Sequence, residues 1–492
     1  MSLIPLQLPA GFYRNGTEFQ ASNRWRDGTL VRFNQGTLRP IGGWRTPHTI
    51  SGETQGRSLV AWIDLGGTRR FAVGYHSSLY AVTSGGVQTD ITPADLAAGS
   101  EDAYQASGYG SGFYGSGVYG TTTTSSATFQ EATTWSLDTW GQNLVACSVA
   151  DGRLLEWDLN VSNNAAPITN APTDCLGLVV TDERFLMALG AGGDSRKVAW
   201  CDREDNTTWT AATTNEAGDL NLQAQGEIML GIRTRGQTLI LTSQEAFSAT
   251  YIGPPYVFGF ERVGTSCGVI SRKAAAAADE GVFWMGERGF HLYSGGAVRD
   301  IPCEVADHVF DDINRDQKSK IFAVTNSKFN EVWFFYPSAD STDNNRYVVF
   351  NYAENHWVTG ELNRAAGVDS GVFPYPLWAC NSGQIHEQEV GFWYNDRVPY
   401  AETGPISLGN GDQVMHAVML IPDENTQGDV TATFKTRFHP NDTERSYGPY
   451  SMASPTDVRF TGRQVRMRVT SARATDWCVG TMRLDAFAGG KR

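Results

Sequence analysis

Apolar residues in this chain fall in short runs that end at Gly, Asn or Asp, and stretches with helical periodicity are few. Such runs predict β-strands. The runs also recur as a unit of strand, turn, strand ending in an aromatic residue, turn and strand. The first example is SLVAWIDLGGTRRFAVGYHSSLYAVTSGGVQTDITP, residues 58–93. Similar units follow from 134–159 onward, and the last is a fragment at 376–388.

Six or seven such units follow one another at intervals of about 30 to 45 residues, which is the range typical of propellers and solenoids. Four-stranded sheets arranged radially leave only short edges, so they need neither disulfides nor helices. The pattern therefore predicts an all-β chain with a β-propeller. An ordinary pair of β-sandwiches is the alternative, although its strands would be spaced less evenly.

One segment has helical periodicity. In EVADHVFDDINRDQKSKIFAV, residues 304–324, the apolar positions Val305, Val309 and Ile313 are four apart. Acidic residues come early and lysines late, as the helix dipole favours. We therefore expect a helix in this segment.

The ends of the chain differ from the middle. Residues before Gly11 include two prolines and predict an extended arm, and LVRFNQGTLRPIGGW, residues 30–44, predicts a hairpin. Near the other end, RQVRMRVTS alternates apolar residues with arginines, as in a half-buried strand. The predicted organisation is listed here by range: an arm and hairpin at 1–50, a β-propeller at 51–392 with a Gly/Tyr-rich insertion at about 98–132, and a C-terminal β-sandwich at 393–492.

The insertion contains GYGSGFYGSGVYG, which repeats every five residues. This period matches neither a helix face nor a strand face, so the run predicts a loop. Tyr, Ser and Gly together are typical of adaptable contact loops. We expect the loop to contact a neighbouring subunit, an adaptor ring or a fibre, and the alternative is a solvated linker. The aromatic residues proposed for the contact are Tyr109, Phe113, Tyr114 and Tyr119.

Composition narrows the functional classes. The chain has 492 residues and a formal net charge of −14, which argues against a surface that grips nucleic acid by neutralising phosphates. An acidic surface that lets nucleic acid slide past stays possible, because like charges repel. Seven scattered cysteines without a C-x-x-C pair predict reduced thiols. The start lacks a secretory pattern and no run is long enough for a membrane helix, so we expect folding in a cytoplasm and no membrane insertion.

Catalytic, cofactor and metal motifs are not found in the sequence, so no residue is assigned to those roles. The run DREDNTTW at 202–209 shares only the Thr-Trp end of the sialidase box. His291 alternates within a strand, and His308 lies beside acids as on a solvated helix face. The acidic run at 340–345 lacks the spacing of a calcium loop and is interpreted as a polar turn.

Basic residues gather near the N-terminus. The cluster alternates with the aromatic residues Tyr13, Trp25 and Phe33, and its arginines are Arg14, Arg24, Arg26, Arg32 and Arg39. Against the negative net charge, this cluster is interpreted as a docking face for an acidic protein. The alternative, equally open from the sequence, is that these arginines only cap the hairpin.

The N-terminal motif resembles a known family. LPAGFYRNGTEFQASNRWRDGTLVRFNQGTLRPIGGWR, residues 8–45, is similar to the start of the tail nozzle, or tail tubular, proteins of short-tailed bacteriophages, which are related to packaged-DNA stabilisation proteins. A first repeat that ends in DITP, residues 90–93, and the pattern at 134–157 extend the resemblance. It is specific only over these segments and brings no catalytic motif.

The resemblance implies a structural virion protein in the phage tail, assembled in the host cytoplasm. Such a protein forms a homo-oligomeric ring, a hexamer, below an adaptor ring and beside tail fibres or a tail needle. Double-stranded DNA passes through its channel without sequence-specific binding and is retained and then ejected. Two alternatives are a receptor-binding or fibre-attachment tail protein and a carbohydrate-active enzyme. The enzyme alternative is disfavoured by the missing carboxylate pair.

Overall fold

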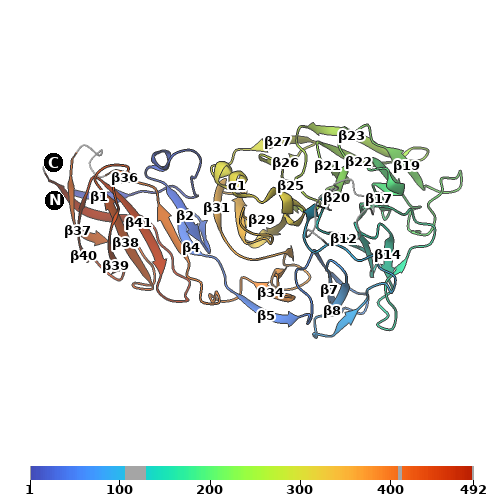
Figure 1. Ribbon diagram of the computed structural model, residues 1–492, viewed down its shortest axis with the longest axis horizontal. Coiled ribbons are helices and arrows are strands. Elements are labelled where there is room, and N and C mark those ends of the chain that lie inside the picture. Colours follow the sequence, from blue (N-terminus) through green and yellow to red (C-terminus); the bar gives the residue numbers. More distant parts are fainter. Residues whose placement is uncertain (1, 106–128, 408–412, 490–492) are drawn as a thin grey trace, which may run out of the picture.

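The computed structural model describes residues 2–105, 129–407 and 413–489, and it is an all-β protein. A ring of small sheets occupies one end of the long axis, and two larger sheets occupy the other (Figure 1). The two chain termini lie side by side at the far end of the larger sheets, because the first strand pairs with the last.

Seven antiparallel sheets of four strands make up the ring. The first four sheets are β6 (Ser58–Ile63), β7 (Arg69–Gly74), β8 (Leu79–Thr83) and β9 (Gln88–Asp90); β12 (Trp135–Trp140), β13 (Asn143–Ser148), β14 (Leu154–Trp157) and β15 (Ala166–Pro167); β16 (Gly177–Val180), β17 (Leu186–Leu189), β18 (Lys197–Trp200) and β19 (Gly218–Asn221); and β20 (Ile228–Thr234), β21 (Gln237–Thr242), β22 (Glu245–Gly253) and β23 (Val257–Thr265). The other three are β24 (Ala275–Ala278), β25 (Gly281–Met285), β26 (Phe290–Ser294) and β27 (Ala297–Ile301); β28 (Phe322–Asn326), β29 (Glu331–Tyr336), β30 (Arg346–Asn351) and β31 (His356–Glu361); and β32 (Ala366–Val368), β33 (Leu377–Ala379), β34 (Gln384–Gln388) and β5 (Trp44–Thr49).

The first strands of the sheets form the inner wall of the ring. Each contacts the first strand of the next sheet, from β6 through β12, β16, β20, β24 and β28 to β32, and β32 contacts β6. The ring therefore closes on itself, and Figure 1 looks down its axis. This arrangement is consistent with a β-propeller. The last sheet takes its outer strand, β5, from the N-terminal segment, so hydrogen bonds between distant segments join the two ends of the ring.

The repeated apolar runs have a packing explanation. A sheet in the ring is covered on both faces by its neighbours, so central strands such as β29 are buried at every position. Gly74 shows how closely the sheets approach. A Cβ at this position would lie 2.5 Å from the Trp135 ring of the next sheet. The Trp135 indole donates a hydrogen bond to Tyr75 O (2.5 Å), which ties the two sheets together.

The expected helix at 304–324 is shorter than its pattern predicts. Helix α1 covers only Ala306–Asp312, and a 3-10 segment, η3 (Arg315–Lys320), follows it. The chain leaves the helix at Ile313, which adopts an extended conformation and bridges to Ser338. Asn314 then caps η3, since its side chain accepts a hydrogen bond from Asp316 N (3.1 Å). Tertiary pairing of Ile313 thus overrides the helical spacing.

Two sheets form the other end of the molecule. One contains β1 (Ser2–Leu6), β42 (Met482–Ala488), β37 (Met415–Ile421) and β40 (Thr456–Gly462) in that order. The other contains β2 (Trp25–Thr29), β35 (Tyr400–Thr403), β41 (Gln464–Ser471), β38 (Val430–Arg437) and β39 (Arg445–Ser451), with β36 (Ile406–Ser407) beside β41. Their apolar side chains share one core. In β41, Val465, Met467 and Val469 are buried, as the alternation predicted.

The N-terminal segment 1–50 is divided among these parts. The arm expected before Gly11 supplies β1, and β2 joins the second of the larger sheets. The predicted hairpin is present as β3 (Val31–Asn34) and β4 (Thr37–Pro40). Its turn places Gln35 and Gly36 at φ 52° and 72°, the left-handed values that a tight hairpin turn requires. Short 3-10 turns occur at η1 (Glu18–Ala21), η2 (Ala191–Gly193) and η4 (Ser327–Phe329).

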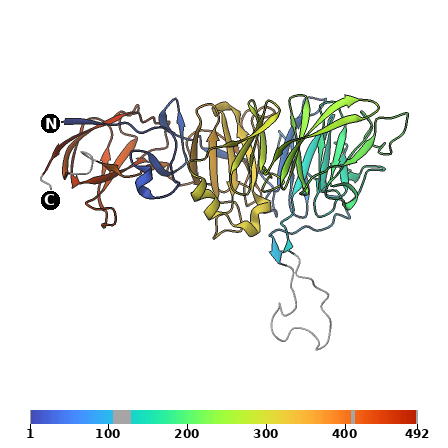
Figure 2. The same cartoon turned by 90° about the horizontal axis from the view of Figure 1, so that it is seen from above.

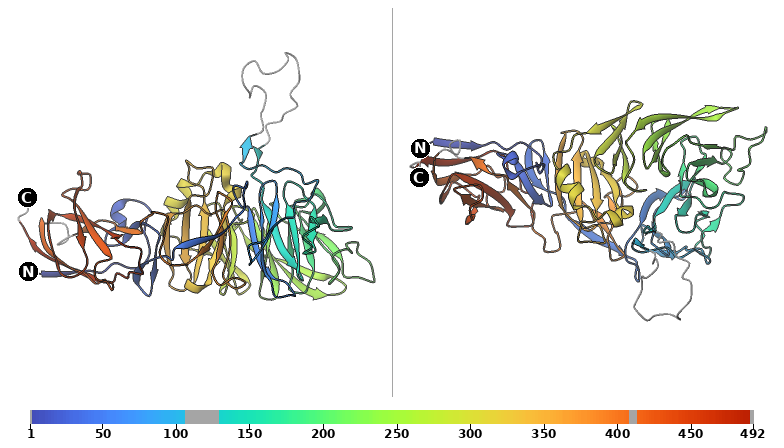
Figure 3. Two further views of the ribbon diagram at one scale, coloured as in Figure 1. Left: turned by 90° about the horizontal axis from the view of Figure 1, so that it is seen from below. Right: turned by 45° about the horizontal axis from the view of Figure 1, so that its top comes forward.

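A short antiparallel stem leaves one face of the ring. It consists of β10 (Tyr104–Gln105) and β11 (Phe129–Gln130) and lies on the same side of the ring as the yellow helical segment that includes α1 (Figures 2 and 3). All seven cysteines are free thiols, and five of them are buried. In the described ranges, helices of the length and apolarity needed to span a bilayer are not found.

Candidate interaction surfaces

Arg32, from the predicted hairpin, is buried where the hairpin meets the ring. It donates hydrogen bonds from Nε and Nη2 to Glu331 (2.9 and 3.0 Å) and from Nη1 and Nη2 to Glu389 (3.0 and 2.5 Å). Its guanidinium also stacks on the Phe329 ring, 3.6 Å from the centroid. One cation thus holds a carboxylate of the sixth sheet and another that directly follows β34 of the seventh sheet.

The two carboxylates have further donors. Gly42 N and Asn326 Nδ2 donate to Glu389 (both 2.9 Å), and the Trp333 indole donates to Glu331 (2.9 Å). Burial raises the pKa of the Glu331 carboxyl, and the Arg32 charge opposes that rise. Sequence reasoning missed both glutamates. The available signal was a lone acid in the apolar strand NEVWFFY, because a buried charge requires a partner.

Aromatic packing extends this junction. Phe33 lies edge-on to Phe12 (5.9 Å between centroids) and to His356 (5.6 Å). The Leu30 N–H donates to the Tyr347 hydroxyl (2.8 Å) of the sixth sheet. Residues of the hairpin motif therefore join the larger sheets to the ring through both polar and apolar contacts.

The predicted basic cluster is only partly a surface feature, because Arg32 is buried at the junction, and Arg14 and Arg24 have partners within the chain. Arg14 pairs with Asp27 (2.9 Å), and Arg24 pairs with Glu304 (2.6 Å) while lying over the Tyr13 ring. These are the contacts expected if the arginines tie the N-terminal segment to its own fold.

Trp25 and Arg26 differ in their exposure. Trp25 is only 4% exposed and packs 6.1 Å from Phe33, so its indole faces the chain's own core. Arg26 stays partly open, and its Nη1 has no acceptor among the described residues. Burial, followed by the charge of Arg14, lowers its pKa.

A polar depression of about 570 Å³ lies between this cluster and α1. It is lined by Arg14 and Arg26 on one side and by His308 with three aspartates of α1 on the other. Burial and the charges of Arg14 and Arg346 lower the pKa of His308 to about 4, so the imidazole is neutral at pH 7. Across the described ranges, three or more His, Cys, Asp or Glu side chains do not converge as metal ligands.

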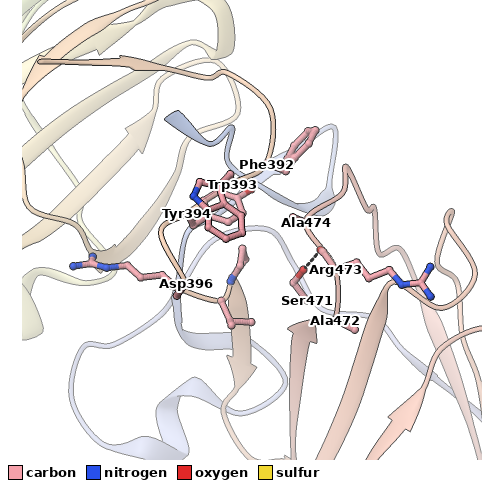
Figure 4. A pocket seen from close by; sticks show the side chains of 11 residues that line it. Phe392, Trp393, Tyr394, Asp396, Ser471, Ala472, Arg473 and Ala474 are labelled. Atoms are coloured by element: carbon pink, nitrogen blue, oxygen red, sulfur yellow. Dashed lines mark hydrogen bonds between the residues drawn. The ribbon is translucent and has the colours of Figure 1, made fainter. Parts of the chain in front are cut away.

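A second groove, of about 260 Å³, lies where the ring passes into the larger sheets (Figure 4). Residues 392–399 form one wall and residues 471–474 the other. Trp393 is 58% exposed there, whereas its neighbour Tyr394 is buried and donates its hydroxyl to Ile41 O (2.5 Å). No pattern in the sequence predicted this groove. An exposed indole at a domain junction is a typical feature of protein contact surfaces.

The other candidate residues occupy structural positions. His291 is buried on β26, with Nδ1 2.7 Å from Asp300. The turn at 202–209 is satisfied internally, because Asp205 accepts hydrogen bonds from Thr207 and Thr208, which lowers the pKa of its carboxyl. In the acidic run 340–345, Asp343 pairs with Lys320 (3.0 Å).

The aromatic residues proposed for the Gly/Tyr loop, namely Tyr109, Phe113, Tyr114 and Tyr119, lie outside the described residues. The segment that leads to the β10–β11 stem is anchored on the ring. Gln317 of η3 donates to Ala103 O and accepts from Ala103 N (both 2.9 Å). Lys320 pairs with Asp102 beside it.

Comparisons with known proteins add little beyond the fold. Family models were searched and none matches the chain, and its sequence matches no curated protein. Among solved structures, a streptogramin B lyase covers 70% of this chain and 97% of its own at 8% identity and a TM-score of 0.44. Virginiamycin B lyase from Staphylococcus aureus with quinupristin (7% identity, 70% and 98% coverage, TM-score 0.43) and BBS1N in complex with ARL6DN (7%, 71% and 97%, TM-score 0.40) are also similar. With TM-scores below 0.5, these likenesses transfer no activity to this chain.

Proposed function

We propose that this chain is a structural protein of a short-tailed phage virion, the distal nozzle of the tail. In this proposal the seven sheets are the blades of one β-propeller, and the two larger sheets form a β-sandwich beside it. Copies of the chain form a closed ring, a hexamer, below an adaptor ring. The ring extends the DNA channel and helps to retain and then eject the genome.

One observation carries the proposal. The N-terminal motif that resembles the nozzle family coincides with the junction of the two parts of this molecule. Arg32, Gly42 and Trp44 of the motif contact the Glu389 carboxylate or pair with the seventh sheet. The residues that carry the resemblance therefore lie where the sandwich meets the propeller. This is expected if members of the family have the same arrangement of the two domains.

Charge supports the same proposal. A net charge of −14 lets copies of the chain line a channel that repels DNA phosphates. Exposed acids on the channel wall would then reduce friction on the passing duplex. Replacing acids on that wall with lysine should slow genome ejection, and an unchanged ejection rate would reject this role for the charge.

The decisive experiment is immunogold labelling of purified virions with an antibody against this chain. Gold at the axial tip of the tail is the expected result, and six-fold averaging of the tail should then place the propeller and sandwich in a ring. Gold on peripheral appendages would instead support the second candidate, a receptor-binding or fibre-attachment protein. The exposed Trp393 groove is the observation that favours this candidate.

A carbohydrate-active enzyme is the third candidate, and a glycan-hydrolysis screen tests it. Turnover that is abolished by an acid-to-amide substitution would establish this activity and overturn the structural role. Absence of turnover together with axial gold is the outcome we expect.

A further inference from the structure

A cavity of about 170 Å³, here called the axial cavity, lies between the inner strands of four of the seven sheets. It is lined by Ser58, Ala275, Ala323 and Ala366, which come from the inner strands β6, β24, β28 and β32. Small side chains at these positions leave room for the cavity, which Leu59 and Phe322 also line. A water molecule occupies about 30 Å³ of the liquid, so the space holds several waters or one small ion.

Arg57, which directly precedes β6, lines this cavity and is 4% exposed. Its Nη1 and Nη2 donate to Gln55 Oε1 and to the Glu101 carbonyl, both of which are neutral acceptors. Its Nε–H has no acceptor among the described residues. A buried guanidinium with an unused donor and no carboxylate in contact is an incomplete arrangement, because buried arginines are normally paired.

Lys273, which precedes β24, lines the same cavity. Burial lowers the pKa of its ammonium to about 8, and the Asp138 charge only partly opposes this effect. Asp138 itself bonds to Arg233 (2.9 Å) and Val180 N (3.0 Å). Asp138 therefore acts on Lys273 through its charge, and among the described residues Lys273 forms no ion pair within 4.0 Å.

The carboxylates whose charges act on Arg57 are bound by other groups. Asp102 and Asp343 both bind Lys320, and Asp343 also accepts from Gln55 (2.6 Å). Glu101 accepts from Thr54 (2.7 Å). The charges of these acids raise the pKa of Arg57 against the effect of burial, but they leave its Nε–H without an acceptor among the described residues.

We propose that the axial cavity binds one small oxyanion, a phosphate or a carboxylate, which accepts hydrogen bonds from Arg57 and interacts with the charge of Lys273. Guanidinium groups bind oxyanions through short, charge-assisted hydrogen bonds. The anion would connect the first and fifth sheets across the closure of the ring.

The test is thermal unfolding of the full chain in increasing inorganic phosphate or acetate, at constant ionic strength set with sodium chloride. A ligand that binds only the folded state raises the melting temperature, so we expect a saturable rise with at least one of the two anions. Phosphate alone would identify a tetrahedral anion, and a response to both would mean that a carboxylate also fits. Absence of a saturable rise with either anion would overturn the proposal.

Variants then locate the site. Arg57→Gln should weaken the apparent affinity about tenfold to a hundredfold, as loss of a hydrogen bond to a charged group predicts. Arg299→Gln, an exposed arginine on the outer strand β27, is the matched control and should respond like the unchanged protein. Equal responses of Arg57→Gln and the control would refute the site.

Two further measurements test the proposal even if Arg57→Gln fails to fold. Lys273→Met removes the second charge while keeping most of the side-chain volume, and it should also weaken the response. Crystals of the unchanged protein soaked in selenate should show an anomalous peak beside Arg57. Ordered water in the cavity without such a peak would mean that solvent alone fills it, which would reject the proposal.

Discussion

Replacing Arg32 with methionine should destabilise the folded protein by about 3–5 kcal/mol at pH 7.5, the usual cost of removing one partner from a buried ion pair. The structure gives the reason. Arg32 makes four hydrogen bonds to Glu331 and Glu389, whose side chains are 3% and 7% exposed. Without the guanidinium, two carboxylates stay buried with no cation in contact.

The loss should depend on pH with a definite sign. Burial already raises the pKa of Glu331 above its usual value in the folded protein, and removal of Arg32 raises it further. A group whose pKa is higher in the folded state stabilises that state when protonated, and this contribution is lost as pH rises through the folded pKa. The deficit of Arg32→Met should therefore be smaller at pH 5 than at pH 7.5.

Guanidinium-induced unfolding followed by tryptophan fluorescence at both pH values measures the effect. Arg39→Met is the matched control, because Arg39 lies directly opposite Arg32 in the hairpin and, among the described residues, its side chain bonds only to Thr37 (3.4 Å). It should change stability by about 0.5 kcal/mol or less. Adding Glu331→Gln to Arg32→Met should recover part of the loss, since an amide carries no charge.

Two results would refute this reasoning. If Arg32→Met costs no more than Arg39→Met, the buried ion pairs do not hold the junction. If the deficit is the same at pH 5 and pH 7.5, uncompensated carboxylates are not its cause.

Three further predictions follow from burial and strand pairing. Cys478 should react with Ellman's reagent at pH 8 well before Cys147, because Cys147 is fully buried and burial raises its thiol pKa far above the usual value; equal rates measured by absorbance would contradict this. Trp393→Ser should leave the melting temperature unchanged but weaken association of the chain, measured by sedimentation velocity, since the indole is exposed; unaltered association would exclude the groove as a contact. Deleting residues 2–6 should lower the stability of the two larger sheets, because β1 pairs along β42 at five positions; an unchanged denaturation midpoint would show that this pairing contributes nothing.

The sequence by itself determined the all-β class and the recurring unit. Buried strands covered on both faces must be continuously apolar, and the turns between them need Gly, Asn or Asp. Both features can therefore be recognised in short stretches of the sequence. The hairpin at 31–40 and the alternation in β41 were predicted for the same reason. A helix within 304–324 was expected, but its end at Asp312 was not, because Ile313 takes an extended conformation and bridges to Ser338.

Only the tertiary structure decided which distant segments pair to complete each sheet. β5 closes the seventh sheet, β1 and β2 join the larger sheets, and Arg32 meets carboxylates that lie 299 and 357 residues away in the chain. The same holds for the axial cavity, where Arg57 and Lys273 meet only because the ring closes. Local sequence patterns predict which segments form strands. Long-range pairing, buried charge and cavity shape depend on contacts that no local pattern specifies.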